Sequence, residues 1–362
     1  MARLGDYTNI KTGKLDANAS SDNGIYPFFT CSKEPLTIDT YSYNCECVLV
    51  AGNGDLNVKY YSGKFDAYQR TYIIESNNEE KLFVRYLYYF LDKYVETLRE
   101  QSIGGVIKYI KLGNLTEASI PLPPLDEQHK IAAVLDKVSN LIAKRRQQLD
   151  KLDELVKSRF IEMFGDPVDN PHGFRKVALS ELAEIRIGPF GSLLHKEDYI
   201  EGGHPLLNPS HIVDGKVAPD SKLTISDKKY DELEAYHLHT GDVVMGRRGE
   251  MGRCAVVPSE GFLCGTGSLL IRTKGEVTAD YIQKTISFPS FRKTIEDMAV
   301  GQTMPNLNVP IVSKFQIIKP PIEVQKNYYK FVAQTDKSKL AIQKSLEKLE
   351  ILKKALMQKY FG

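Results

Sequence analysis

The histidines and aspartates best suited to metal binding or catalysis occur in short groups. The further ligands or catalytic residues that such a site needs are not near them in the sequence. His237 and His239 have the spacing of metal ligands, but no further ligand is near them in sequence, which favours an alternating strand or a loop. Asp220 and Asp227, followed by two lysines, would suit a magnesium-dependent nuclease, but they lie in a polar run with turn character. Neither a G-x-x-x-x-G-K-[ST] phosphate loop nor a G-x-G-x-x-G motif after a strand is present. The sequence therefore predicts no catalytic residue, no metal site and no cofactor.

The cysteines point to a reducing compartment. Cys31, Cys45, Cys47, Cys254 and Cys264 form an odd set without a C-x-x-C pair, which favours free thiols over disulfides or a zinc site. No run of the sequence approaches the ~18 consecutive apolar residues of a membrane span. The first residues lack the apolar core of a signal peptide. We therefore expect a cytoplasmic protein.

Two sets of basic, amide and tyrosine side chains are candidates for binding DNA. The first set is Lys59, Tyr60, Tyr61, Lys64, Arg70, Lys108, Tyr109, Lys111 and Asn114. The second set is Arg247, Arg248, Arg253, Gln302, Thr303, Asn306 and Asn308. Arg, Lys, Asn and Gln read base edges in the major groove, and nearby glycines let backbone amides approach phosphates. For any single residue a solvated loop or a surface ion pair is the alternative, but two parallel sets favour DNA contact.

The charge balance argues partly against a protein that grips DNA alone. Residues 1–125 contain 13 Lys and Arg against 15 Asp and Glu, and residues 166–322 contain 18 against 20. A DNA-binding domain usually displays a basic face. Either the basic side chains gather on one side of each domain, or other subunits supply most of the phosphate contacts.

The two sets belong to the two copies of an internal repeat. Residues 149–165 align without a gap with residues 346–362, and seven of the 17 positions are identical. The same offset of 197 pairs Pro123 with Pro320, Gln128 with Gln325, and Gly104 with Gly301. Near the start of each copy the offset is 175, so the second copy is 22 residues longer.

Upstream of the paired prolines, each copy has the pattern of a mixed α+β domain with short strands. β-Branched segments such as residues 48–51 and 242–245 are separated by Gly, Asn and Asp. One helix is expected in each copy, over residues 79–101 and 278–299. The aromatic residues of the first helix recur at helical spacing, which favours a core face over a platform for stacking bases.

Downstream of the prolines, a heptad pattern predicts a long coiled-coil-like helix in each copy. The residues expected to pack between these helices are Leu135, Ile142, Leu149, Leu152, Val156, Ile342, Leu346, Leu349 and Leu356. Val134, Leu141 and Leu155 widen the first apolar stripe, and burial of the two stripes against each other is the simplest arrangement. The expected division is a domain at 1–125, a long helix at 126–165, a domain at 166–322 and a long helix at 323–362.

Helix length restricts how the two copies can be arranged. A helix over the 38 residues 127–164 would be ~57 Å long at ~1.5 Å per residue. The 11 residues 165–175 can span at most ~36 Å, so the second domain must start near the far end of that helix. The fold class we expect is α+β, with two tandem-repeated α/β domains separated by an antiparallel pair of long helices with approximate twofold symmetry.

A proline–glutamine–helix signature occurs in both copies. It comprises residues 120–131 (IPLPPLDEQHKI) and the helix ending at residues 159–167 (RFIEMFGDP), and it is repeated between residues 320 and 362. With this signature, essentially the whole chain resembles the specificity subunit of type I restriction–modification systems. The resemblance implies that each target-recognition domain reads one half of a bipartite DNA site, while the helix pair sets the gap between the halves.

The same resemblance implies partners. DNA methyltransferase subunits, usually two, would dock on the helices and the flanking domain surfaces, and restriction motor-nuclease subunits would join through them. S-adenosylmethionine for methylation, and ATP and Mg for cleavage, would belong to those partners, so that this chain would be a non-catalytic recognition subunit. Two alternatives stay open, namely a scaffold whose two heads bind protein and an enzyme with its own active site.

Overall fold

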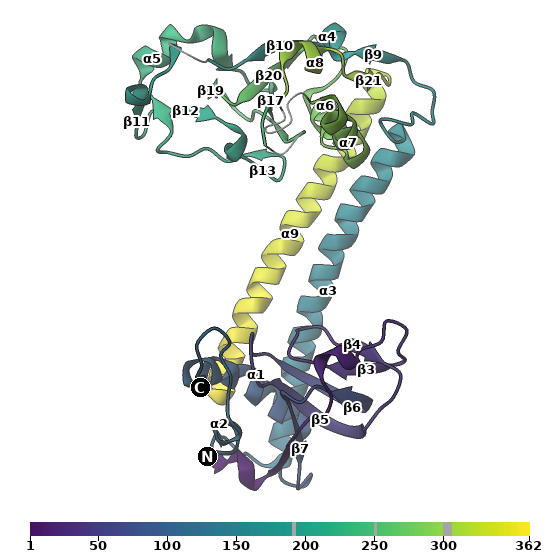
Figure 1. Cartoon of the computed structure of the whole chain (residues 1–362), viewed down its shortest axis with the longest axis vertical. Helices are drawn as coiled ribbons and strands as arrows, with labels where there is room; N and C mark the ends of the chain where they lie inside the picture. The colour runs from purple at the N-terminus through teal and green to yellow at the C-terminus, as the bar shows by residue number, and fades with distance from the viewer. Residues whose placement is uncertain (190–192, 250–251, 300–305) are drawn as a thin grey trace. The chain divides into compact units, whose positions relative to one another are not determined.

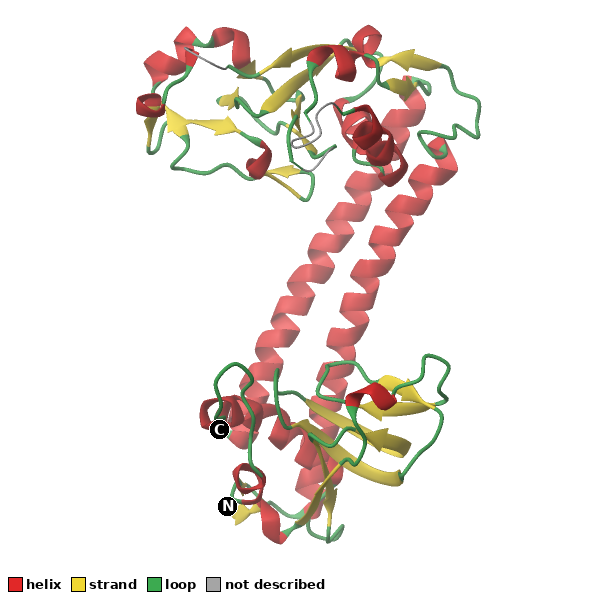
Figure 2. Cartoon of the chain, in the orientation of Figure 1, coloured by secondary structure: helices red, strands yellow, loops and turns green. Residues whose placement is uncertain are grey.

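The computed structural model describes residues 1–189, 193–249, 252–299 and 306–362, which form two compact units. Unit 1 comprises Met1–Leu149 together with Leu340–Gly362, and unit 2 comprises Asp150–Lys339 (Figure 1). Each unit combines β-sheets with helices, as the expected α+β class requires (Figure 2). Each unit also contains part of both long helices, α3 (Leu125–Phe164) and α9 (Ile322–Phe361).

Unit 1 is built on a six-stranded sheet with the strand order β2-β7-β5-β6-β3-β4. Its strands are β1 (Ala2–Arg3), β2 (Thr8–Thr12), β3 (Tyr26–Phe29), β4 (Leu36–Ile38), β5 (Tyr43–Ala51), β6 (Val58–Ala67), β7 (Thr71–Ser76) and β8 (Ser119–Ile120). Its own helices are α1 (Val84–Gln101) and α2 (Leu112–Thr116). β5 pairs antiparallel with β6 and β7, whereas β3 pairs parallel with the end of β6.

Unit 2 distributes its main strands over two sheets, with the orders β10-β20-β17-β18 and β11-β15-β12-β19-β16. Its strands are β9 (Lys176–Ala178), β10 (Ala183–Ile187), β11 (Tyr199–Ile200), β12 (His204–Leu207), β13 (Ile212–Val213), β14 (Lys216–Val217), β15 (Thr224–Ile225), β16 (His237–Leu238), β17 (Val243–Gly246), β18 (Cys254–Val256), β19 (Phe262–Cys264), β20 (Ser268–Thr273) and β21 (Gln316–Ile318). Its own helices are α4 (Leu179–Leu182), α5 (Asp227–Glu232), α6 (Ala279–Ile286), α7 (Pro289–Met298) and α8 (Val309–Ser313).

The two units share one backbone framework, which confirms the repeat. The order β2-β7-β5-β6 of unit 1 corresponds to β10-β20-β17-β18 of unit 2, and the parallel pair β3–β6 corresponds to β12–β19. The amide of Gly13 donates to the carbonyl of Thr71, and the amide of Gly188 donates to that of Ser268. A Cβ added at Gly13 or Gly188 would lie 2.1 or 1.9 Å from a backbone oxygen. Both positions therefore require glycine because the facing backbone is too close for a side chain.

One strand of unit 1 is divided in unit 2. β6 is a single ten-residue strand that pairs with β5 along most of its length and with β3 at its end. In unit 2, β18 takes the first role and β19 the second, and residues 257–261 separate them. This separating segment contains Pro258, which lacks an amide donor, and Gly261 with φ of +94°. The second sheet of unit 2 therefore begins where unit 1 continues one strand.

The bounds predicted for the helix within each domain were partly wrong. The helix expected over residues 278–299 is divided into α6 and α7, because Pro289 forces the residue before it out of the helical region. That residue, Phe288, has φ −68° and ψ 138°. In unit 1, the helix expected from residue 79 begins only at Val84.

Both long helices begin beside a buried glutamine. Oε1 of Gln128 accepts the amide of Phe83 at 3.0 Å, and its Nε2 donates to the carbonyl of Pro123 at 2.9 Å. Gln325 repeats this arrangement, because its Oε1 accepts the amide of Thr278 at 2.9 Å and its Nε2 donates to the carbonyl of Pro320 at 2.9 Å. Both glutamines have no exposed surface. Each one fastens a long helix to the start of the helical region of its own domain.

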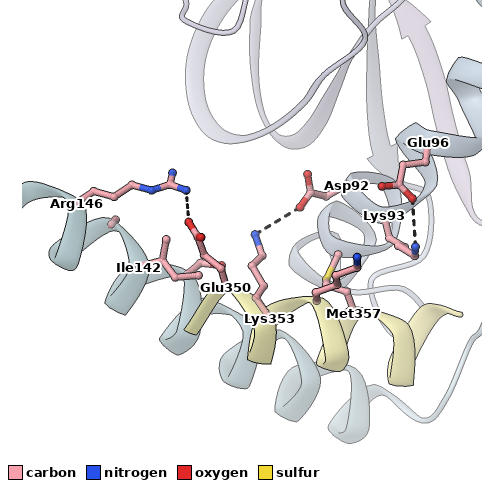
Figure 3. A pocket seen from close by; sticks show the side chains of 11 residues that line it. Asp92, Lys93, Glu96, Ile142, Arg146, Glu350, Lys353 and Met357 are labelled. Atoms are coloured by element: carbon pink, nitrogen blue, oxygen red, sulfur yellow. Dashed lines mark hydrogen bonds and ion pairs between the residues drawn. The ribbon is translucent and has the colours of Figure 1, made fainter. Parts of the chain in front are cut away.

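In unit 1, the two long helices pack against each other through an apolar seam. The seam residues are Val138, Ile142 and Leu346, with Leu149, Leu349 and Leu356 partly buried beside them, while Leu135 lies in the main core. Arg146 of α3 pairs with Glu350 of α9 at 2.7 Å, next to a groove of about 710 Å³ that α1 also lines (Figure 3). Lys353 pairs with Asp92 of α1 at 3.6 Å across this groove.

In unit 2, the contact between the long helices is more aromatic and more polar. The hydroxyl of Tyr328 on α9 donates to the carbonyl of Val156 on α3 at 3.2 Å. Phe160 packs against Tyr328 and against Tyr281 of α6, with ring centroids 5.5 and 6.2 Å away. Lys339 pairs with Asp153 at 2.5 Å. Leu152 of this unit is half-buried, and so is Ile342, which belongs to the part of α9 in unit 1.

Part of the wide apolar stripe of α3 lies outside the buried seam. Val134, Leu141 and Leu155 are 40%, 37% and 47% exposed. Two packed helices cover a seam only two positions per heptad wide, so a third row of apolar residues stays outside it.

Candidate nucleic-acid interface

In unit 1, three segments distant in sequence meet at Gly52, directly after β5. The amide of Gly52 donates to the carbonyl of Arg70 at 2.8 Å, and the amide of Ile110 donates to the carbonyl of Gly52 at 2.9 Å. Asn53 and Tyr109 are linked by a β-bridge. We call residues 52–54, Arg70 and residues 108–111 the unit 1 corner.

In unit 2, the same three hydrogen-bonded segments meet at Arg247, directly after β17. The amide of Arg247 donates to the carbonyl of Gly267 at 3.0 Å, and the amide of Leu307 donates to the carbonyl of Arg247 at 2.9 Å. Arg248 and Asn306 are linked by a β-bridge. We call residues 247–249, Gly267 and residues 306–308 the unit 2 corner. The corners thus contain Arg70, Lys108, Tyr109 and Lys111 from the first set of candidates, and Arg247, Arg248, Asn306 and Asn308 from the second.

The polar candidates at and next to the unit 1 corner are three exposed cations and one side-chain amide with a structural role. The side chains of Arg70, Lys108 and Lys111 are exposed. Asn114 instead accepts the amide of Lys111 at 2.7 Å and donates to Gln101 Oε1 at 3.1 Å. Asn114 therefore holds the start of α2, and the three cations are the groups available to an anionic ligand.

The remaining unit 1 candidates lie on β6, where successive side chains point to opposite faces of the sheet. The ring of Tyr60 lies 4.3 Å from the guanidinium carbon of Arg85, and its hydroxyl donates to Glu46 at 2.7 Å. Burial, and then the hydrogen bond to Glu46, raise the pKa of Tyr60 to about 12. Arg85 also pairs with Asp136 of α3, so Tyr60 helps to join the domain to the long helix.

The neighbours of Tyr60 on β6 are also in contact with the protein. Tyr61 packs against Phe29 at 5.1 Å between ring centroids, and the ammonium of Lys64 lies 4.7 Å from the ring of Tyr41. Lys59 donates to the side chain of Asn57, and burial lowers the pKa of Lys59. The structure therefore does not bring these residues together with the unit 1 corner into one exposed set.

The unit 2 corner places two arginines side by side. Nε of Arg247 donates to Oδ1 of Asn306 at 3.3 Å, and burial and the positive charge of Arg248 lower the pKa of Arg247. A hollow of about 290 Å³ beside them is also lined by Ile187, Thr266 and Gly267. This arrangement offers two guanidinium groups, with donors in a planar fork, to an acceptor in or beside the hollow.

Other unit 2 candidates have structural contacts or fall outside the described residues. The guanidinium of Arg253 donates to the carbonyl of Pro209 at 3.3 Å. Asn308 caps α8 by accepting the amide of Ile311 at 3.0 Å. Gln302 and Thr303 lie outside the described residues.

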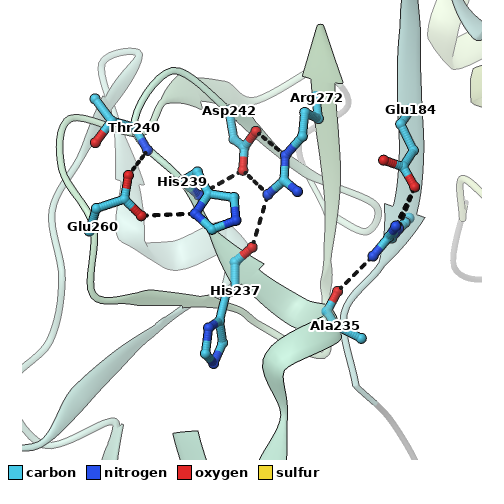
Figure 4. Close-up of polar contacts among 9 residues, drawn as sticks. Glu184, Ala235, His237, His239, Thr240, Asp242, Glu260 and Arg272 are labelled. Carbon is cyan, nitrogen blue, oxygen red and sulfur yellow. Dashed lines mark hydrogen bonds and ion pairs between the residues drawn. The ribbon is translucent and has the colours of Figure 1, made fainter. Parts of the chain in front are cut away.

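An ion pair that the sequence did not reveal supports β17 (Figure 4). Arg272 of β20 donates to both carboxylate oxygens of Asp242, at 2.9 and 2.7 Å, and also to the carbonyl of His237 at 3.2 Å. Asp242 is 3% exposed and directly precedes the strand that leads to Arg247. Because the two residues are 30 positions apart, neither spacing nor composition could have identified this pair.

Next to this pair, Glu260 organises the turn before β17. Its carboxylate accepts the amide of Thr240 at 2.8 Å and lies 2.9 Å from Nδ1 of His239 (Figure 4). The hydrogen bond from Thr240, and then the one from His239, lower the pKa of Glu260 to about 2. His237 begins β16, so the two histidines belong to a strand and the turn after it, the alternative that their spacing favoured.

The described residues contain no cluster of three or more His, Cys, Asp and Glu side chains positioned to hold a metal ion. All five cysteines are free thiols. Burial raises the pKa of both Cys254 and Cys264 to about 12, so neither is a ready nucleophile or ligand. Among the helices described, none has the length and apolar content needed to cross a membrane.

Comparison with known proteins identifies the family to which the chain belongs. The family model of the type I restriction modification DNA specificity domain matches residues 1–154 and 171–353. The chain therefore belongs to this family, whose known role is DNA recognition. The two matched segments also correspond to the two copies of the repeat.

Two curated relatives show how far the similarity extends. The EcoDI specificity subunit of Escherichia coli is 38% identical over 154 residues, which cover 42% of this chain and 34% of that protein. The MjaVIII specificity subunit of Methanocaldococcus jannaschii is 21% identical over 387 aligned positions, which cover 99% of this chain and 90% of that protein. The chain thus matches about a third of one relative and nearly the whole of the other.

Two solved structures share the fold. The S subunit of a type I restriction–modification system from M. genitalium has a TM-score of 0.65 and 16% identity, covering 100% of this chain and 95% of that one. A chain from a study of complex assembly and conformational transition of the type I R-M system has a TM-score of 0.61 and 18% identity, covering 99% and 96%.

Proposed function

We propose that the corner of each unit reads one half of a bipartite DNA target. The observation that carries this proposal is the backbone hydrogen-bond pattern that the two corners share while presenting different side chains. Gly52 and Asn53 occupy the positions of Arg247 and Arg248, and Arg70 occupies that of Gly267. Equivalent frames with different side chains would read two different half-site sequences.

The two long helices would set the number of unread base pairs between the half-sites. Each is a continuous helix of 40 residues, ~60 Å long at ~1.5 Å per residue. Packed side chains join α3 to α9 in both units, which supports a helix pair stiff enough to fix a spacing. Segments held only by flexible linkers would tolerate a range of gaps.

In this proposal the chain is the recognition subunit, and the chemistry belongs to its partners in the cytoplasm. Methyltransferase subunits would dock on the long helices, where the exposed row of Val134, Leu141 and Leu155 offers apolar surface. Motor-nuclease subunits would join through them. S-adenosylmethionine, ATP and Mg would be bound by these partners, which would also supply most phosphate contacts and so offset the acidic balance of both domains.

Selection from a random duplex pool tests the proposal. The full chain, assembled with its proposed methyltransferase partner, is expected to enrich two short sequence elements separated by a fixed gap. A chimaera with residues 1–120 taken from another member of the family is expected to change one element only. Binding without sequence preference would favour the scaffold alternative, and methylation or cleavage of DNA by the chain alone would favour an enzyme.

A further inference from the structure

The loop between α1 and α2 presents aliphatic side chains directly to solvent. Val106 is fully exposed, Ile107 is 63% exposed and Ile103 is 43% exposed. Single exposed apolar residues are common on protein surfaces, whereas contiguous exposed apolar groups are typical of interaction sites. This loop, residues 103–109, adjoins the cations of the unit 1 corner.

The loop is held in one shape at its base. Ile103 and Tyr109 exchange backbone hydrogen bonds of 3.0 and 2.9 Å, which close a five-residue excursion. The amide of Gly54 donates to the carbonyl of Lys108 at 2.9 Å and fastens the loop to the turn after β5. Gly104 has φ of +118°, and a Cβ there would lie 2.5 Å from the carbonyl oxygen of Ile107. The exposed tip is therefore pre-organised, which lowers the entropy cost of binding.

The surroundings of the tip indicate what kind of surface it meets. Residues 101–116 contain Lys108 and Lys111 and no Asp or Glu. Both lysines are exposed, and so is Leu112, at 47%. An apolar tip followed by two exposed cations complements a ligand with an anionic exterior and an apolar interior. Stacked base pairs between two phosphate backbones have both properties.

We propose that Val106 and Ile107 insert as a wedge between neighbouring base pairs of the half-site read by unit 1. Lys108 and Lys111 would then contact the flanking phosphates. Side chains of this type unstack a base step and bend the duplex when they enter it from the minor groove. This inference rests on the proposed function, because it assumes that DNA lies at the unit 1 corner.

The experiment compares matched loop variants of the full chain assembled with its methyltransferase. The DNA is the duplex that the unmodified complex selects from the random pool, with 2-aminopurine substituted at successive positions to report unstacking. The test variant combines Val106→Ser with Ile107→Ser, and a conservative variant combines Val106→Ile with Ile107→Val. Ile25→Ser is the control, because Ile25 is a 77% exposed aliphatic residue elsewhere in unit 1.

For the unmodified complex, 2-aminopurine fluorescence is expected to rise at one base step of one half-site. The serine variant is expected to lose this signal and to bind about tenfold more weakly, a change of about 1.4 kcal/mol. The slope of log K against log salt should stay the same, because no phosphate contact is removed. The conservative variant and Ile25→Ser are expected to behave like the unmodified complex, whereas Lys108→Ala should reduce the salt slope by about one.

The outcomes separate the wedge from the function on which it rests. Unchanged fluorescence and affinity in the serine variant would overturn the wedge while leaving sequence recognition intact. The wedge would also be overturned if the serine variant failed to assemble with the methyltransferase in the absence of DNA, because the tip would then be a protein contact. Failure of the unmodified complex to select any sequence would overturn the proposed function itself.

Discussion

Gly52 and Arg247 occupy the same position in the two units, between the same two backbone hydrogen bonds. In unit 1 the residue without a side chain lies at the turn, and the cation is on the neighbouring segment as Arg70. In unit 2 the cation lies at the turn, and the neighbouring segment has Gly267. The shared backbone hydrogen bonds therefore fix the positions from which a side chain can reach a ligand. The residue types at these positions decide which of the two segments carries the positive charge.

The strands behind the corners differ in how they are supported. In unit 2, β17 and β20 are joined by the ion pair of Asp242 with Arg272. The equivalent positions of unit 1, inferred from the strand pairings, are the buried Cys47 and the partly buried Glu75, which pairs with Lys11 of β2. The turn with two arginines is therefore supported by an ion pair, whereas the turn with glycines rests on an apolar strand.

The largest effect on the free energy of unfolding is expected from breaking the ion pair of Asp242 with Arg272. Asp242→Ala would leave Arg272 without its bidentate partner in a buried setting, at a cost of about 3 kcal/mol in the free energy of unfolding. This figure is at the low end for buried pairs because the Arg272 side chain is 31% exposed. Equilibrium urea denaturation measures the change. Glu184→Ala, which removes an exposed pair with Arg186, is the control and should cost well under 1 kcal/mol.

Replacing either buried glutamine is expected to lower the free energy of unfolding by an intermediate amount. The loss should be about the same for Gln128 in unit 1 and for Gln325 in unit 2. Gln128→Ala and Gln325→Ala would each leave a backbone donor and a backbone acceptor without their partner, costing about 2 kcal/mol. Hydrogen exchange resolved by peptide should show faster opening at the start of α3 in one variant and of α9 in the other. An effect confined to one unit would contradict the shared framework.

At the unit 2 corner, the expected effect is on DNA affinity and leaves the free energy of unfolding nearly unchanged. If Arg247 contacts a base edge, Arg247→Ala should cost about 1–3 kcal/mol and relax specificity at one position of one half-site. Lys111→Ala in unit 1 is a useful comparison, because loss of a phosphate contact weakens binding to all sequences. Selection from a random pool, repeated with each variant, distinguishes the two. A uniform loss with Arg247→Ala would assign that side chain to phosphate instead.

The smallest effect is expected from Glu260 at low pH. Its pKa in the folded protein is about 2, below the usual 4.5 of glutamate, so its contribution to stability is present above pH 4.5 and lost as the pH falls toward 2. The protection of the Thr240 amide, measured relative to its intrinsic exchange rate at each pH, should therefore decrease over this range in the unmodified protein. Glu260→Gln should exchange faster already at neutral pH and lack the transition. An unchanged profile would show that the carboxylate does not hold this turn.

Much of the fold could be predicted because the sequence is a repeat. Alignment of the copies located Gln128 and Gln325, and heptads located both long helices within a few residues. The sequence could not predict that unit 2 has two strands, β18 and β19, where unit 1 has the single strand β6. This difference depends on which neighbouring strand each segment pairs with. The separation of α6 from α7 could have been predicted from Pro289, a local signal that the helical spacing of the segment obscured.

The candidate site was harder to predict because it is assembled from distant segments. Residue types suggested Arg70, Tyr109 and Arg247, but only the strand pairings show which of the chosen residues converge. Tyr60 shows the limit of choosing by type, because its ring packs on Arg85 within the domain. The pair of Asp242 and Arg272 gave no sequence signal, since charged residues 30 positions apart are common.

The claim that the helix pair sets the gap between half-sites is tested most directly by changing helix length. Removing seven residues from the middle of each long helix keeps the heptad pattern and shortens each by ~10.5 Å at ~1.5 Å per residue. At ~3.4 Å per base pair, the selected gap should shorten by about three base pairs while both half-site sequences stay the same. Selection of the original gap by the shortened protein would contradict the account.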